Sequence, residues 1–128
     1  MPNNIEIKIM KKHAIVPKNF KVDTSIKTLE IHGKEWFDRV NGNSYNSVQV
    51  FVNEGMKNAF SFSIPFQYGY GNYFEQSAIE HLVKVGVLSG KFSHRDRVHS
   101  GKLKIESYKT EKCLQREVKA HGTALQTI

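Results

Sequence analysis

The segment Phe60-Ser61-Phe62-Ser63-Ile64-Pro65-Phe66 alternates apolar residues with serine or proline at a period of two. Successive side chains of a β-strand point to opposite faces, so this pattern predicts a strand with one apolar face. Upstream, Trp36 to Val40 leads into Asn41-Gly42, a pair that favours a tight turn between strands. Ser44 to Val52 follows with valine at every second position of its last half, and Asn53-Glu54-Gly55 turns the chain again. Residues 36–66 therefore predict an antiparallel meander with one apolar face.

A helix is expected to cover this apolar face. Over residues 72–85 the apolar side chains recur at helical spacing, at Phe74, Ala78, Leu82 and Val85. Asn72 fits the N-cap position, and Glu75 three residues later completes a capping box. Gly86 supplies a left-handed residue that ends the helix. The predicted core, residues 36–88, is thus a meander packed against one main helix.

Shorter elements are expected on both sides of this core. Asn4 to Ile9 alternates apolar and polar residues, and Ile26 to Ile31 forms a second apolar segment that His32-Gly33 interrupts. Both segments predict strands. Together with the core they give an α+β fold in one domain, residues 1–128, since a chain of 128 residues fits one domain.

The segments after the helix are less regular. Residues 89–101 are polar and basic, which predicts a loop. Leu103 and Ile105 then alternate with lysines and predict a short strand. Residues 110–120 fit a helix with Leu114 and Val118 turned inward and Gly122 at its end, and they also fit a strand.

Charge is unevenly distributed along the chain. Residues 1–28 carry a net charge of +4, residues 29–88 carry −2, and residues 89–128 carry +5, for a total of +7. The two basic flanks, residues 1–28 and 89–128, therefore enclose a slightly acidic core. Basic clusters attract polyanions and speed encounter with them. We expect a nucleic acid or nucleoprotein partner, and the alternative is a basic protein without one.

Cysteine content and hydropathy indicate the kind of cellular compartment in which the chain is expected. Cys113 is the single cysteine, so an internal disulfide is excluded and no Cys/His cluster has zinc-site spacing. We expect a reducing intracellular compartment, and no metal or other cofactor. The first residues lead into an alternating segment, and no apolar stretch approaches 18 residues, so neither a signal peptide nor a membrane span is expected.

A tyrosine-rich segment joins the last meander strand to the helix. It reads Phe66-Gln67-Tyr68-Gly69-Tyr70-Gly71-Asn72-Tyr73, and its glycines permit close approach by a partner. Tyr68, Tyr70 and Tyr73 are candidate binding residues that could stack on bases or fill a pocket in another protein. The alternative is a structural loop whose tyrosines cover the edge of the core.

A second candidate region lies in the basic C-terminal flank. Five cations there are candidate phosphate contacts: Lys91, Arg95, Arg97, Lys102 and Lys104. His94, Asp96 and His99 lie among them, and together they define the alternative of a small nuclease. No second carboxylate cluster or nucleophile motif stands beside them in the sequence, so we expect a protein that is not an enzyme.

Two resemblances add a context. The order of three strands and a helix in residues 36–88 is similar to the end of a double-stranded-RNA-binding domain, and Ser47 to Asn53 looks like that family's central strand. That family grips phosphates with a lysine pair at the start of its last helix. The matching stretch here, Gly71 to Gln76, has no lysine, so the resemblance implies a similar topology only.

The chain also resembles small uncharacterised bacteriophage and prophage proteins. The resemblance rests on Trp36-Phe37, Asn41 to Tyr45, Val48 to Val52, and Pro65 to Gly71 before the helix. Small phage proteins without enzyme motifs are often inhibitors of host defence, including anti-CRISPR proteins. This resemblance implies a phage or mobile-element protein that binds a nucleic acid or nucleoprotein, such as a CRISPR effector with its guide RNA. The remaining alternative is an accessory protein that binds DNA or RNA without specificity.

Overall fold

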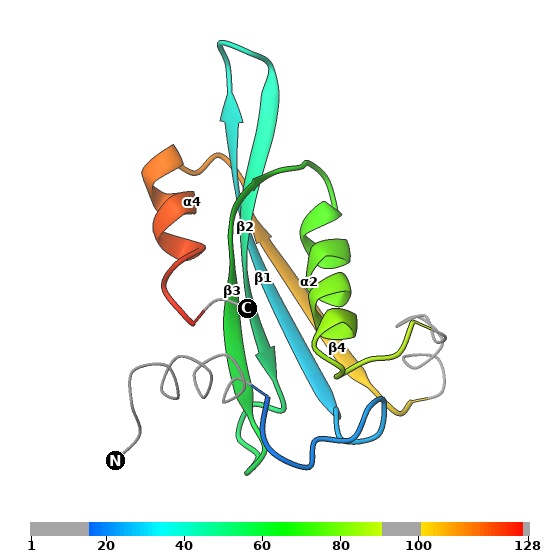
Figure 1. Cartoon of the computed structure of the whole chain (residues 1–128). Coiled ribbons are helices and arrows are strands. Elements are labelled where there is room, and N and C mark those ends of the chain that lie inside the picture. The colour runs from blue at the N-terminus through cyan, green and yellow to red at the C-terminus, as the bar shows by residue number, and fades with distance from the viewer. Residues whose placement is uncertain (1–15, 91–100, 127–128) are drawn as a thin grey trace.

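The computed structural model describes residues 16–90 and 101–126. Its elements are strands β1 (Thr28–Asp38), β2 (Asn43–Val52), β3 (Phe60–Tyr68) and β4 (Lys104–Thr110), and helices α2 (Tyr73–Lys84) and α4 (Gln115–His121). They form one four-stranded mixed sheet with two helices, which confirms the α+β class (Figure 1). The predicted strand at residues 4–9 lies outside the described residues.

The sheet has the strand order β3-β2-β1-β4. Strands β1, β2 and β3 form the predicted antiparallel meander, and β4 pairs with the other side of β1 in parallel. The prediction of a strand around Leu103 and Ile105 is therefore confirmed, with Leu103 buried just before the strand begins. Helix α2 follows β3 and precedes β4 in the chain, and it lies over one face of the sheet (Figure 1).

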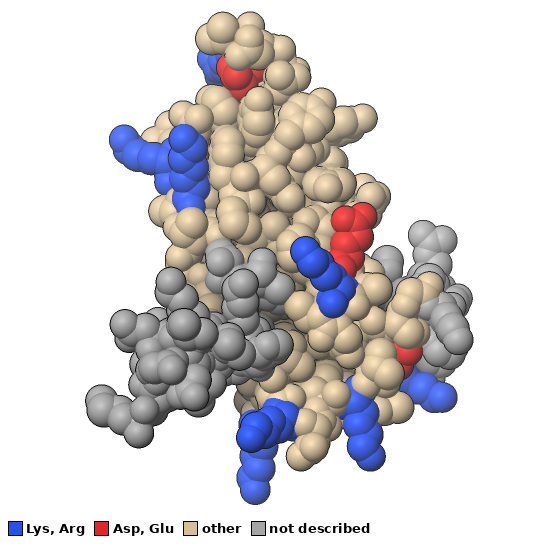
Figure 2. All heavy atoms as spheres, viewed as in Figure 1, with Lys and Arg blue, Asp and Glu red and all other residues tan. Residues whose placement is uncertain are grey.

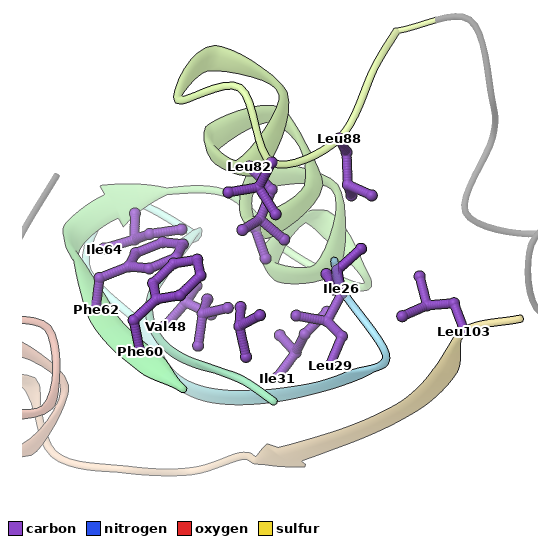
Figure 3. Packing of buried hydrophobic residues seen from close by; sticks show 14 of the residues in the cluster. Ile26, Leu29, Ile31, Val48, Phe60, Phe62, Ile64, Leu82, Leu88 and Leu103 are labelled. Carbon is purple, nitrogen blue, oxygen red and sulfur yellow. The ribbon is translucent and has the colours of Figure 1, made fainter. Parts of the chain in front are cut away.

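The hydrophobic core lies between α2 and one face of the sheet. Strand side chains at every second position point toward Leu82 and its neighbours on the helix (Figure 3). The fully or almost fully buried members include Leu29, Ile31, Val48, Val50, Phe62, Ile64, Ala78 and Leu82. The apolar face that recurs every two residues in the strands and the one that recurs every 3.6 residues in the helix are thus buried against each other in one core.

The interruption expected at His32-Gly33 was wrong, because β1 continues through both residues. Gly33 pairs in register with Val48 on the core face of the sheet. A Cβ atom at Gly33 would lie 2.6 Å from Cδ2 of the Phe74 ring, so the glycine makes room for a side chain of α2. It marks close packing between sheet and helix, where we had expected the end of a strand.

The predicted C-terminal ending of α2 is confirmed, but the predicted N-terminal capping box is not formed. Asn72 occupies the N-cap position but its side chain makes no capping hydrogen bond. Glu75 instead accepts a hydrogen bond from Ser107 Oγ at 2.9 Å, so no capping box forms. At the other end, Val87 N–H donates to Leu82 O at 2.9 Å after Gly86, as expected for a left-handed helix ending.

Helix α4 packs on the opposite face of the sheet. Ser47 and Gln49 alternate with the core valines of β2, and both bond to His121 of α4: Ser47 Oγ lies 3.0 Å from His121 Nδ1, and Gln49 Nε2 donates to His121 O at 3.2 Å. Val118 is buried against this face, but Leu114, which we had expected to point inward, is half-exposed. The helical alternative for this segment is therefore correct, with a shorter helix.

A β-bulge in β3 changes the position of one predicted core residue. The pairing of β2 with β3 shifts between Asn46 and Val48, which leaves one extra residue in β3 near Pro65. Phe66 therefore does not share a face with Phe62. Its ring stacks on Tyr45 instead, with the centroids 5.0 Å apart. A bulge on an edge strand is where proline is tolerated in a sheet.

In the part of the chain that the structure describes, no helix has the length and apolar character needed to cross a membrane.

Candidate binding surface

The tyrosine loop, residues 68–73, connects β3 to α2. Tyr68 and Tyr70 are 60% and 72% exposed. Together with Tyr73 they line an open cleft of about 480 Å³ at the N-terminal end of α2. The structure thus brings together all three tyrosines that the sequence singled out.

Close packing holds the loop in place. Asn46, which is buried in β2, donates from Nδ2 to Gly69 O at 3.2 Å. Gly69 N–H donates to Ser44 O at 3.0 Å. A Cβ atom at Gly69 would lie 2.4 Å from Cδ2 of Tyr73, so the loop and the first helical residue are in direct contact. These contacts fix the backbone that carries the exposed tyrosines.

A polar network of side chains from β2, β3, β4 and α2 lies beside the same loop. Gln67 Nε2 donates to Asn46 Oδ1 at 3.0 Å and lies 3.1 Å from Ser77 Oγ of α2. From β4, Lys109 Nζ donates to Gly71 O at 2.9 Å and also pairs with Glu35 of β1. The loop is therefore tied directly to β2 and β4, and through Lys109 to β1.

An aromatic cluster adjoins the loop on the α4 side of the sheet. Trp36 stacks on Tyr45, Tyr45 stacks on Phe66, and Tyr68 meets Tyr45 edge to face at 5.8 Å. Lys119 of α4 lies 5.4 Å from the centroid of the Phe66 ring, within the range of a cation–π interaction. Sequence analysis missed this cluster because the bulge near Pro65 brings Phe66 to this face.

The predicted cations do not all lie beside the tyrosines. Lys91, Arg95, Arg97 and the nuclease alternative His94, Asp96 and His99 are outside the described residues. Lys102 and Lys104 are exposed, as their alternation with Leu103 predicts, and Lys104 pairs with Glu106 at 3.2 Å.

The register places Lys104 and the tyrosine loop at opposite ends of the sheet. Lys104 pairs with Thr28 at the start of β1. Tyr68 pairs with Tyr45 of β2, which in turn pairs with Trp36 near the end of β1. From Thr28 to Trp36 the strand rises by roughly 26 Å. Basic side chains also gather over α4 (Figure 2), and Arg116 and Lys119 of this helix are exposed.

Within the described ranges, no group of three or more His, Cys, Asp and Glu side chains is placed to hold a metal ion. Cys113, also among the described residues, is a buried free thiol. Among the described residues, His121 has a strongly shifted pKa: burial lowers it to about 4, and Lys34 and His32 contribute less.

Comparison with known proteins identifies no relative: no protein-family model, no curated protein and no solved structure matches this chain.

Proposed function

We propose that this chain is a non-enzymatic binding protein that engages a nucleic acid or a nucleoprotein complex, with the tyrosine loop as its specific contact. The observation that carries the proposal is the exposure of Tyr68 and Tyr70 on a loop that a buried hydrogen bond from Asn46 to Gly69 O anchors to β2. A rigid scaffold that presents tyrosines loses little entropy on binding. Tyrosine is also enriched among the residues that dominate binding energy.

The basic residues supply the electrostatic part of the proposed interaction. Lys102 and Lys104, at one end of the sheet, would contact phosphates. Lys91, Arg95 and Arg97, which lie outside the described residues, would do the same. Because the tyrosine loop is at the other end, one partner that touches both must span roughly 26 Å, the length of the strand between them. An extended nucleic acid or a nucleoprotein has that reach, and a small ligand does not.

The proposed biological setting rests on the resemblance to small phage and prophage proteins. In that setting the chain acts in the bacterial host cytoplasm and inhibits a host defence complex, such as a CRISPR effector with its guide RNA. A CRISPR effector with its guide RNA presents both protein and nucleic acid. Exposed tyrosines and separate cations fit those two components.

The test is a binding measurement with a matched control. The probes are single-stranded and duplex RNA and DNA oligonucleotides and a reconstituted CRISPR effector with guide RNA. We expect the Tyr68→Ala/Tyr70→Ala variant to bind its best probe at least about 10-fold more weakly, which corresponds to about 1.4 kcal/mol. Tyr108→Ala, which removes a half-exposed tyrosine of β4 outside the cleft, should leave affinity unchanged. Equal affinity of the double variant and the parent chain for every probe would refute the proposal.

The proposal also states that the bound nucleic acid stays intact. Purified protein is incubated with labelled RNA and DNA in magnesium, manganese or chelator, and we expect no cleavage. Cleavage that is lost in both His94→Ala and His99→Ala would establish the nuclease alternative in its place.

A further inference from the structure

The hairpin formed by β1 and β2 extends beyond the rest of the sheet (Figure 1). The pairing of β1 with β4 ends at Lys34 and Thr110, so in the described chain the last four residues of β1 have a strand neighbour only in β2. The segment after β4 crosses beside this edge, where Cys113 N–H donates to Glu35 O at 3.0 Å. Between the two segments lies an open cleft of about 740 Å³, here called the hairpin cleft.

Large apolar side chains around the hairpin cleft are exposed. Phe37 and Val40 of the hairpin are 51% and 92% exposed, and Leu114 on the opposite wall is 50% exposed. Trp36 also lines the cleft. Apolar side chains gathered at one place on a surface typically mark a site of interaction.

The charges around the hairpin cleft are mainly positive. Arg39 and Lys112 line it, and neither forms an ion pair with a described carboxylate. Asp38 is the acidic residue in the lining, but its oxygens already accept hydrogen bonds from Asn41 Nδ2 and from the backbone N–H groups of Val40 and Asn41. The side-chain hydrogen bond from Asn41 is the main cause of the lowered pKa of Asp38.

We infer that the hairpin cleft binds an acidic, amphipathic segment of a protein partner. An aliphatic or aromatic side chain of that segment packs between Phe37 and Leu114, and its carboxylates pair with Arg39 and Lys112. Phosphates could pair with the same two cations, but a nucleic acid backbone has no apolar group to cover Val40 and Leu114. This site is separate from the tyrosine cleft and does not depend on the function proposed above.

The sole tryptophan of the chain, Trp36, lines the cleft and reports binding through its fluorescence. The probe is a displayed library of random 12-residue peptides, selected on the full chain and in parallel on Val40→Ser/Leu114→Ser. We expect the full chain to enrich peptides that combine Leu, Phe or Trp with several Asp or Glu residues, and the variant to enrich none of these. Synthetic copies of the selected peptides should change the Trp36 emission on binding.

Variants with reversed charges provide the second test of the inference. Arg39→Glu/Lys112→Glu should weaken the selected peptides at least 10-fold and enrich basic peptides instead. Lys57→Glu/Lys84→Glu makes the same change in net charge on the β2–β3 turn and at the end of α2, and should leave affinity unchanged. Circular dichroism confirms the fold of each variant, and if the serine variant does not fold, the charge-reversal arm decides.

Three results would overturn the inference. The first is no enrichment on the folded full chain. The second is enriched peptides that are basic or uncharged, or that bind the folded serine variant equally well. The third is a single-stranded oligonucleotide that quenches Trp36 and is weakened by Arg39→Glu/Lys112→Glu but not by Val40→Ser/Leu114→Ser, which would assign the cleft to nucleic acid.

Discussion

At the scale of single residues, Gly33 shows how closely α2 approaches the sheet. The ring of Phe74 is buried over it, with Cδ2 and Cγ at 2.6 and 2.8 Å from where a Cβ would lie. Both distances are shorter than any ordinary carbon–carbon contact, so a side chain here displaces the ring or the helix. Gly33 therefore sets the distance between the two layers of the core.

Gly33→Ala should destabilise the protein by about 1–3 kcal/mol, the range for overpacking a core. A smaller residue at position 74 relieves the clash, so Gly33→Ala/Phe74→Leu should be more stable than the sum of the single changes predicts, by at least about 0.5 kcal/mol. Urea denaturation of the four proteins measures this coupling. Strict additivity would mean that the ring does not rest on Gly33.

His121 is the second residue with a defined physical role. Its ring is half-buried where α4 meets the sheet, and Ser47 Oγ lies 3.0 Å from Nδ1. Burial, and to a smaller extent Lys34 and His32, lowers its pKa from 6.5 to about 4. The neutral ring is therefore the form that fits the folded protein.

This lowered pKa makes stability depend on pH. Between pH 6.5 and 4, His121 binds a proton in the unfolded chain but not in the folded protein. The stability that the neutral His121 ring contributes is therefore fully present above pH 6.5 and is lost as the pH falls toward 4. After allowance for solvent screening we expect a loss on the order of 1–2 kcal/mol. His121→Gln keeps a polar group near Ser47 but does not titrate. In urea denaturation at several pH values, its stability should fall less than that of the parent chain over this window, and parallel curves would contradict the assignment.

At the scale of elements, the tyrosine loop depends on Gly69. A side chain there would meet Tyr73 at 2.4 Å and Asn46 Nδ2 at 2.9 Å. We expect Gly69→Ala to cost about 1–3 kcal/mol of stability and to weaken partner binding, because it displaces Tyr73 from the cleft wall. Gly90→Ala is the matched control, since nothing lies within 4 Å of its added Cβ. Denaturation and binding curves that are the same for both variants would show that the loop tolerates a side chain at Gly69.

The meander and α2 were predictable because local periodicity determines them. The apolar alternation in residues 60–64 and the spacing of Phe74, Ala78 and Leu82 each report one buried face. The full length of β1 was not predictable, since Gly33 resembles a strand breaker until its contact with Phe74 is known. Parallel pairing of β4 with β1 likewise depends on contacts between residues more than 70 positions apart, such as Thr28 and Lys104.

At the scale of the whole molecule, the candidate binding surfaces lie at opposite ends of the sheet. The tyrosine loop and the hairpin cleft occupy the end of the sheet near Trp36, and Lys104 marks the other end. The tyrosines could be predicted as a site because they are adjacent in the sequence. The aromatic cluster could not, because Phe66 reaches Tyr45 only through the bulge in β3. The hairpin cleft could not, because the segment after β4 places Leu114 beside the hairpin only in the folded chain.

The salt dependence of binding tests the central claim most directly, because it separates the two contributions. Affinity for the best nucleic acid or nucleoprotein probe is measured over a series of salt concentrations. Arg95→Ala/Arg97→Ala should lower the slope of log affinity against log salt by about 1.4 to 1.8, since each lost phosphate contact contributes about 0.7 to 0.9. Tyr68→Ala/Tyr70→Ala should lower affinity at every salt concentration and leave the slope unchanged. If the tyrosine variant binds as tightly as the parent chain throughout the series, the tyrosine loop is a structural connection and the proposed function is wrong.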